Sequence, residues 1–126
     1  MTPTNREIVE RYLKNYNDKD IEGMLAQFAD DAKFESVSNT SGVVRTADKD
    51  GLRELAAKSA EFFEARRQTA LAWVVDGDRI AVEVEFWCRI AKDLPGGSKA
   101  GQEMTLRGAS FFTLHDGRIT RLIDYM

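Results

Sequence analysis

The sequence is poor in the residues that bind zinc or form disulfides. It contains one cysteine, Cys88, and one histidine, His115. A single cysteine excludes a disulfide within the chain and is typical of a reducing compartment, so we expect a cytoplasmic protein. One histidine and one cysteine are too few for a zinc site built from nitrogen and sulfur ligands. We therefore expect no bound metal.

Long apolar runs and clustered basic residues are missing as well. No apolar run approaches the roughly 20 residues that a membrane-spanning helix needs. The 18 basic and 21 acidic residues give a net charge of -3 and are spread along the chain, without the basic face of a nucleic-acid-binding protein. Pro95-Gly96-Gly97 is not followed by the lysine and hydroxyl residue of a phosphate-binding loop. We expect no membrane or nucleic-acid partner and no cofactor.

What is present is typical of one globular domain with three helices near its N-terminus. The chain has 126 residues, of which 43% are hydrophobic and 31% charged, which suits a single domain over residues 1–126. Thr4 and Glu7 have the spacing of a capping box, and the helix that follows should end near residues 17–19. Asp20 can cap a second helix that buries Phe28. A third helix should begin between Thr46 and Asp48.

The rest of the sequence predicts strands. Lys33 to Val37 is expected to be a short strand, and after Glu64 apolar residues recur at every second position. This predicts strands over 68–75, from residue 80, over 102–114 and over 119–125. It also predicts loops over 38–43 and 92–101, and hairpin turns with an Asp-Gly pair at residues 76–78 and 116–117. The order predicts an α+β fold in which a curved antiparallel sheet forms a cone around the three helices. Such a cone leaves an apolar pocket at its open end.

Two groups of segments carry a resemblance to a known family. The first comprises residues 9–13 (VERYL), 20–24 (DIEGM) and 28–35 (FADDAKFE), and the second residues 100–108 (AGQEMTLRG), 115–119 (HDGRI) and 124–125 (DY). With the element order between them, the chain resembles the nuclear transport factor 2-like superfamily, in particular SnoaL-like polyketide cyclases and ketosteroid isomerases. The resemblance implies a cystatin-like α+β roll. It implies no single reaction, because the superfamily also includes dehydratases, epoxide hydrolases and non-enzymatic binders.

The resemblance implies roles for a few residues. Ketosteroid isomerases use an aspartate base and an oxyanion hole made of a tyrosine and a protonated aspartate. On this pattern Tyr12 takes the tyrosine position, whereas Ser36 and Ser110 fall on or beside the two acid positions, and a serine transfers no proton at neutral pH without a neighbouring base. The cyclase and epoxide-hydrolase branches place an acid on the last strand, which matches Asp124. Residues 82–86 lack the arginine of an epoxide hydrolase, so the cyclase-like pattern fits best.

Asp124 and Tyr12 are the candidate catalytic residues. A carboxyl in an apolar pocket has a raised pKa and can transfer protons near neutral pH. Asp124 is equally compatible with a position in water or beside an arginine. Tyr12 lies on the apolar stripe of the first helix, where its hydroxyl could stabilise an oxyanion, or where it could be a core tyrosine bonded to the backbone.

A small, largely apolar organic molecule is the expected ligand. The residues expected to line its pocket are Ser36, Trp73, Val84, Phe86, Ser110, Phe112 and Met126. The expected activity, if the protein is an enzyme, is cofactor-free isomerisation or aldol-type cyclisation. The alternative is a non-catalytic ligand-binding or dimerisation module of the same fold.

The opposite face of the sheet predicts a protein partner. Glu83, Glu85, Trp87 and Arg89 alternate with apolar residues and should share the outer face. Charges mixed with a tryptophan on one face indicate an interface rather than a surface in bulk water. We expect a homodimer that is formed through this outer face.

Overall fold

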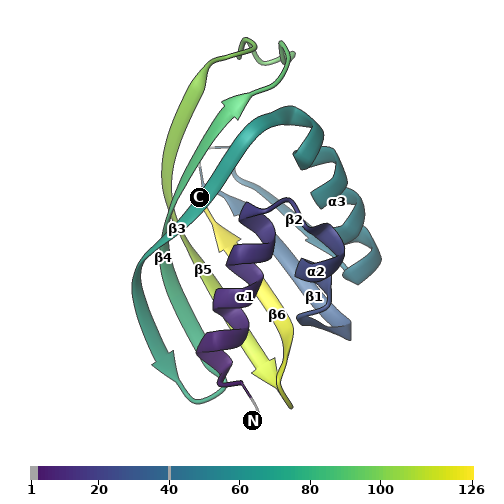
Figure 1. Cartoon of the computed structure of the whole chain (residues 1–126), viewed down its shortest axis with the longest axis vertical. Coiled ribbons are helices and arrows are strands. Elements are labelled where there is room, and N and C mark those ends of the chain that lie inside the picture. The colour runs from purple at the N-terminus through teal and green to yellow at the C-terminus, as the bar shows by residue number, and fades with distance from the viewer. Residues whose placement is uncertain (1–2, 40) are drawn as a thin grey trace.

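A computed structural model describes residues 3–39 and 41–126 and shows three helices on one side of a six-stranded curved sheet (Figure 1). Thr40 of the predicted loop over 38–43 lies outside the described residues. The elements follow in the order α1 (Asn5–Asn17), α2 (Ile21–Leu25), β1 (Phe28–Ser38), β2 (Val43–Ala47), α3 (Lys49–Phe62), β3 (Phe63–Asp76), β4 (Arg79–Ile90), β5 (Glu103–His115) and β6 (Arg118–Tyr125).

Side-chain caps fix where the helices begin. The Thr4 hydroxyl accepts a hydrogen bond from the Glu7 amide at 3.1 Å, and the Thr4 amide donates to the Glu7 carboxylate at 3.0 Å, so the predicted capping box is confirmed. Asp20 and Asp48 cap α2 and α3 in the same way, each accepting from an amide of the first turn. These caps satisfy amides that have no partner inside the helix.

The second helix and the segment after it differ from the prediction. α2 ends at Leu25, and Phe28 is the first residue of β1 rather than part of the helix, although it is buried as expected. β2 was not predicted, because its residues lie between an expected loop and an expected helix. Its sequence, VVRTA, is rich in β-branched residues that favour strands.

The strand order is β2-β1-β6-β5-β4-β3. Four of the neighbouring pairs are antiparallel, as predicted, and the β1–β6 pair is parallel. The difference arises because the meander β3 to β6 returns the end of the chain to the free edge of β1, where both strands run in the same direction. β6 is therefore held between strands on both of its sides.

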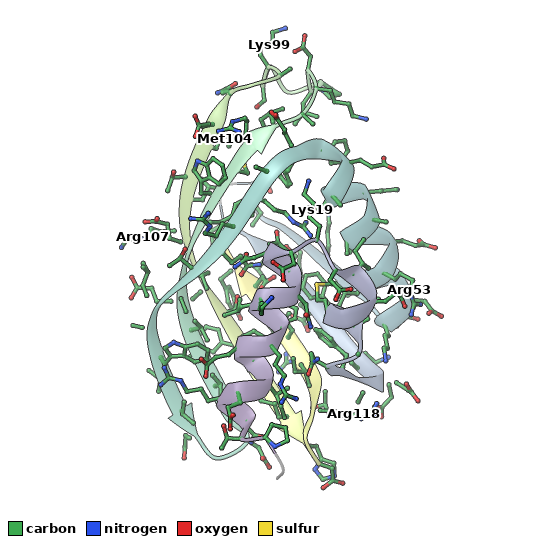
Figure 2. All side chains as sticks on the ribbon, in the orientation of Figure 1. Lys19, Arg53, Lys99, Met104, Arg107 and Arg118 are labelled. Atoms are coloured by element: carbon green, nitrogen blue, oxygen red, sulfur yellow. The ribbon has the colours of Figure 1, made fainter. Side chains whose placement is uncertain are left out.

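The helices cover the inner face of the sheet and close it into the predicted α+β cone (Figure 1). The predicted alternation along β4 is confirmed, since Ile80, Val82 and Val84 are buried while Glu83 is exposed. The main core lies between the three helices and the inner face of β1 and of β4 to β6. The β4–β5 hairpin extends beyond the helices and carries Lys99 near its tip (Figure 2).

We predict that Phe28→Ala destabilises the fold by about 3–5 kcal/mol. The Phe28 side chain is fully buried and its ring meets that of Tyr12 edge-on at 5.6 Å, so its loss leaves a cavity where α1 meets the sheet. Urea unfolding measures the change. Glu54→Ala on the exposed face of α3 is the control and should stay within about 0.5 kcal/mol of the unsubstituted protein. An equally small effect of Phe28→Ala would contradict this account of the core.

Candidate functional site

A cavity of about 260 Å³ lies between the helices and the inner face of the sheet. Its lining is mainly apolar and comprises Tyr12, Tyr16, Met24, Phe34, Leu52, Leu55, Ala56, Ser59, Phe63, Arg66, Gln68, Phe86, Asp124 and Met126. A hollow of similar volume, about 240 Å³, lies on the outer face between Val74, Phe111 and Ile123. The inner cavity is the better candidate for chemistry because it combines apolar walls with an aspartate and two tyrosines.

Asp124 enters this cavity because of its place in β6. It pairs in register with Ser36 of β1 on one side and with Ser110 of β5 on the other, so the three side chains lie on one face of the sheet. The Ser110 hydroxyl, which is buried, donates a hydrogen bond to Asp124 Oδ1 at 2.6 Å. This bond fixes the orientation of the carboxyl group.

Burial raises the pKa of the Asp124 carboxyl from 3.8 to about 6. The hydrogen bond from Ser110 acts in the opposite direction, because it stabilises the carboxylate, but it is the weaker effect. Asp124 as a residue keeps partial contact with solvent, whereas its carboxyl group lies deep enough for burial to dominate. A carboxyl group with a pKa near 6 can both accept and return a proton close to neutral pH.

Tyr12 contributes a neutral hydroxyl to the same cavity. Burial raises its pKa well above 10.0, the charge of Asp124 adds to this effect, and the Gln68 side chain opposes it. The phenol therefore stays protonated and can act as a hydrogen-bond donor. Its ring is held edge-on between Phe28 and Phe112, with 5.6 Å between ring centroids in each pair.

The other predicted pocket residues lie at different depths. Phe86 and Met126 line the cavity together with Tyr12 and Asp124. Ser110 donates a hydrogen bond to the Asp124 carboxyl group, and Ser36 lies opposite Asp124 on the neighbouring strand β1. The described residues that line this cavity do not include five of the predicted ones, namely Ser36, Ser110, Trp73, Val84 and Phe112.

Val84 and Phe112 are buried in the main core instead, and Trp73 packs against that core from another side. The guanidinium of Arg6 covers the Trp73 ring at 4.6 Å from its centroid. Trp73 lines a shallow groove between α1 and β3. These three side chains therefore support the cavity or lie apart from it.

Arg66, Gln68, Tyr16 and Ser59 line the cavity but were not among the predicted site residues. Arg66 was missed because the strand was expected to begin at Gln68, whereas β3 begins at Phe63. Extending the every-second-residue pattern back from Gln68 would have placed Arg66 on the inner face. The alternation that indicates Arg66 was thus present in the sequence, but it was not used because the strand was expected to begin two residues later.

Metal ligands do not gather in the described part of the chain. Among residues 3–39 and 41–126 no three histidine, cysteine, aspartate or glutamate side chains are grouped closely enough to hold a metal ion. His115 is the exposed last residue of β5, beside Asp116, and Cys88 is buried. Within the same described ranges, no helix has the length and apolar character needed to cross a membrane.

We predict that Asp124→Asn changes the pH dependence of stability. Because the pKa of folded Asp124 is raised from 3.8 to about 6, the folded chain keeps a proton that the unfolded chain loses. The stability from this group is present below about pH 4 and is lost as the pH rises through about 6. The free energy of unfolding of Asp124→Asn, relative to that of the unsubstituted protein, should therefore rise by on the order of 2 kcal/mol from pH 4 to pH 7.

Urea unfolding at the two pH values measures this gain. Asp31, an exposed acid of β1, provides the control, and Asp31→Asn should change the free energy of unfolding by the same small amount at both pH values. A gain of the same size at pH 4 and pH 7 would show that the carboxyl group of Asp124 has an ordinary pKa.

Comparisons with solved structures agree with this architecture. A proposed polyketide cyclase from Xanthomonas campestris pv. campestris aligns with a TM-score of 0.84 and 22% identity, covering 97% of this chain and 89% of that one. IdmH, a proposed polyketide cyclase from Streptomyces antibioticus, aligns with a TM-score of 0.82 and 19% identity, covering 97% and 91%. At these identities the likeness concerns the fold alone.

A third structure has a bound small molecule. It is a protein with a ketosteroid isomerase-like fold from Catenulispora acidiphila DSM 44928 in complex with trimethylamine, and it aligns with a TM-score of 0.75 and 20% identity, covering 100% of this chain and 87% of that one. A search of curated protein sequences found no significant match.

The family model that describes the SnoaL-like domain matches residues 9–122, which is most of the chain. The match includes α1 from residue 9 on, the whole of β1 to β5 and the part of β6 that leads to Asp124. The predicted resemblance is thereby confirmed, and the chain belongs to the SnoaL-like domain family of the nuclear transport factor 2-like superfamily.

Proposed function

We propose that this protein binds a small, largely apolar organic molecule in its inner cavity and transfers a proton on it by acid–base chemistry. The observation that carries the proposal is a carboxyl group with a pKa of about 6 in a mainly apolar cavity that also contains a protonated tyrosine. Both groups come from elements that the core holds in place, so they need little rearrangement to meet a ligand.

The proposed reaction begins at a carbon next to a carbonyl group. The Asp124 carboxylate accepts the proton of that carbon, and the electron pair of the broken C–H bond moves onto the carbonyl oxygen to form an enolate. Tyr12 donates a hydrogen bond to this oxygen as its charge develops. Asp124 then returns the proton to another carbon, which is an isomerisation, or the enolate attacks a second carbonyl of the ligand and Asp124 protonates the new alkoxide, which is an aldol cyclisation.

A non-catalytic ligand-binding module is the second candidate function. The observation that favours it is that Ser36 and Ser110 occupy the inner-face positions where the resemblance to ketosteroid isomerases implies acids. The Ser110 hydroxyl donates a hydrogen bond to Asp124, so it orients that carboxyl group and does not replace the missing acid. On this alternative the cavity holds its ligand without turnover.

Exchange of carbon-bound hydrogen in D2O tests the two candidates with 2-tetralone, an apolar bicyclic ketone, as the probe. We expect enzyme-dependent deuterium uptake next to the carbonyl, with a rate that rises with pH through about 6 as Asp124 loses its proton. Asp124→Asn should lower this rate by about 10²–10⁴-fold and Tyr12→Phe by about 10²-fold, measured by proton NMR.

Matched controls are available on the surface. Asp116→Asn and Tyr125→Phe change an exposed acid and an exposed tyrosine, and neither should change the exchange rate. Binding of 2-tetralone without exchange would favour the non-catalytic module. Exchange that survives Asp124→Asn would refute the proposed role of this residue.

We also propose that the protein forms a homodimer through the outer face of its sheet. Val74, Phe111 and Tyr125 are exposed there, and Val74 has 67% of its surface accessible. The Phe111 and Tyr125 rings meet edge-on at 5.5 Å. Exposed apolar side chains on neighbouring strands favour burial against a partner, and a twofold axis allows the same surface to serve both subunits.

Charged residues border this apolar patch. Arg107 pairs with Glu83 at 3.4 Å, and its side chain points away from the helices (Figure 2). Trp87, around which the sequence suggested the interface, donates to Glu103 at 2.9 Å and is only partly exposed. The apolar centre of the proposed interface therefore lies on β5 and β6 rather than around Trp87.

Light scattering coupled to size exclusion tests the dimer. The unsubstituted protein should elute with the mass of two chains at micromolar concentration, and Phe111→Arg should give one chain because it places a charge in the apolar patch. Phe62→Arg is the control, because it changes an exposed phenylalanine at the end of α3, away from the outer face. A monomeric mass for the unsubstituted protein would refute the dimer.

A further inference from the structure

Arg66 is a buried cation in the wall of the inner cavity. It lies on the inner face of β3, its exposed fraction is 5%, and it lines the same cavity as Asp124 and Tyr12. A charged side chain is seldom so deeply buried unless an opposite charge accompanies it. The surroundings of this guanidinium group are therefore informative.

The partners of Arg66 within the chain are neutral. Nη1 donates to the Ser59 hydroxyl at 3.1 Å, Nη2 donates to the Tyr16 carbonyl at 3.4 Å, and the guanidinium group stacks on the Tyr16 ring at 3.9 Å from its centroid. The buried Nε has no hydrogen-bond partner. A guanidinium group has five N–H donors, so these two bonds leave three donors without a hydrogen-bond partner among the described residues.

No carboxylate neutralises this charge within residues 3–39 and 41–126, since none of their ion pairs includes Arg66. Asp124 shares the cavity, but burial raises its pKa, whereas a direct contact with a guanidinium group would lower it. The two groups thus belong to one cavity without forming a pair. The positive charge and the free N–H donors remain without an anionic partner.

We infer that Arg66 binds a carboxylate on the ligand, so that the cavity selects an apolar organic molecule that carries one carboxylate group. This inference rests on the proposed ligand site. The planar guanidinium group presents paired N–H donors that match the two oxygens of a carboxylate, and such charge-assisted bonds are stronger than bonds between neutral groups. The stacking on Tyr16 and the bond to Ser59 hold the group ready for this contact.

The size of the cavity limits the apolar part of the ligand. A cavity of about 150 Å³ in a protein core binds benzene, and the volume here is about 260 Å³. Two fused rings with a carboxylate are therefore a suitable probe. 2-Naphthoate has this form, and 2-naphthamide has nearly the same shape without the charge.

Isothermal titration of both probes at pH 7 tests the inference. The unsubstituted protein should bind 2-naphthoate at least tenfold more tightly than 2-naphthamide. Arg66→Met, which keeps the length of the side chain and removes the charge, should reduce this preference to about one. Arg67→Met is the matched control, because the next side chain along β3 is exposed and should leave the preference unchanged.

Thermal unfolding without a ligand separates binding from a structural role. If the charge serves the ligand, Arg66→Met should unfold at the same temperature as the unsubstituted protein or at a higher one, because an unpaired buried charge is removed. Should Arg66→Met fail to fold, Arg66→Lys replaces it. This variant keeps the charge but loses the paired donors, so the preference for 2-naphthoate should fall several-fold without disappearing.

The outcomes distinguish this inference from the proposed function. Equal affinities of the two probes for the unsubstituted protein, or a preference that survives Arg66→Met, would refute the role of Arg66 and leave the apolar ligand site intact. If neither probe binds, the proposed ligand site is refuted together with the inference. Ala56→Leu fills part of the cavity and should lower the affinity for both probes by the same factor if they bind there.

Discussion

The pairing of β6 on both of its sides is the constraint on which the site depends. Parallel pairing with β1 and antiparallel pairing with β5 fix the register that places Asp124 between Ser36 and Ser110. A slip of one residue would turn Asp124 to the outer face and would expose Leu122, which is fully buried. The burial of apolar residues on β6 thus determines that the Asp124 side chain points to the inner face. Burial on that face also raises the pKa of its carboxyl group.

Most of the fold could be predicted because its signals are local. The capping box at Thr4, the two Asp-Gly turns and the alternation along β4 each involve residues that are close in sequence. The parallel pairing of β1 with β6 could not be predicted in this way, because it joins segments from opposite ends of the chain. β2 was also missed, since a strand of five residues next to a helix cap is hard to separate from a loop.

The site was predicted less completely, and the reason lies in β3. A helix normally gives way to a strand through a turn that marks the boundary, but α3 ends at Phe62 and β3 begins at Phe63. Without a turn to mark the boundary, the strand was expected to begin only at Gln68, and the alternation was not extended back to Arg66. The register shift between Ala70 and Ala72 then changes the phase of the strand, so that Trp73 lies beside the main core while Gln68 lines the cavity. The alternation rule itself holds on either side of the shift.

The strand order explains how two opposite charges can share a cavity without pairing. Asp124 lies on β6 and Arg66 on β3, with β5 and β4 between them. Three strand spacings, about 14 Å across the sheet, separate the two strands. The register adds an offset along the strands, because Arg66 pairs with Cys88 whereas Asp124 lies across β5 from Val82, six residues away on β4. The curvature of the sheet brings both side chains toward the same apolar space. A ligand between them would meet an acid–base group near one end and a fixed positive charge near the other. For a molecule with a carboxylate and a ketone, this arrangement would set which carbon faces Asp124, so the same geometry that keeps the charges apart would also orient the reaction.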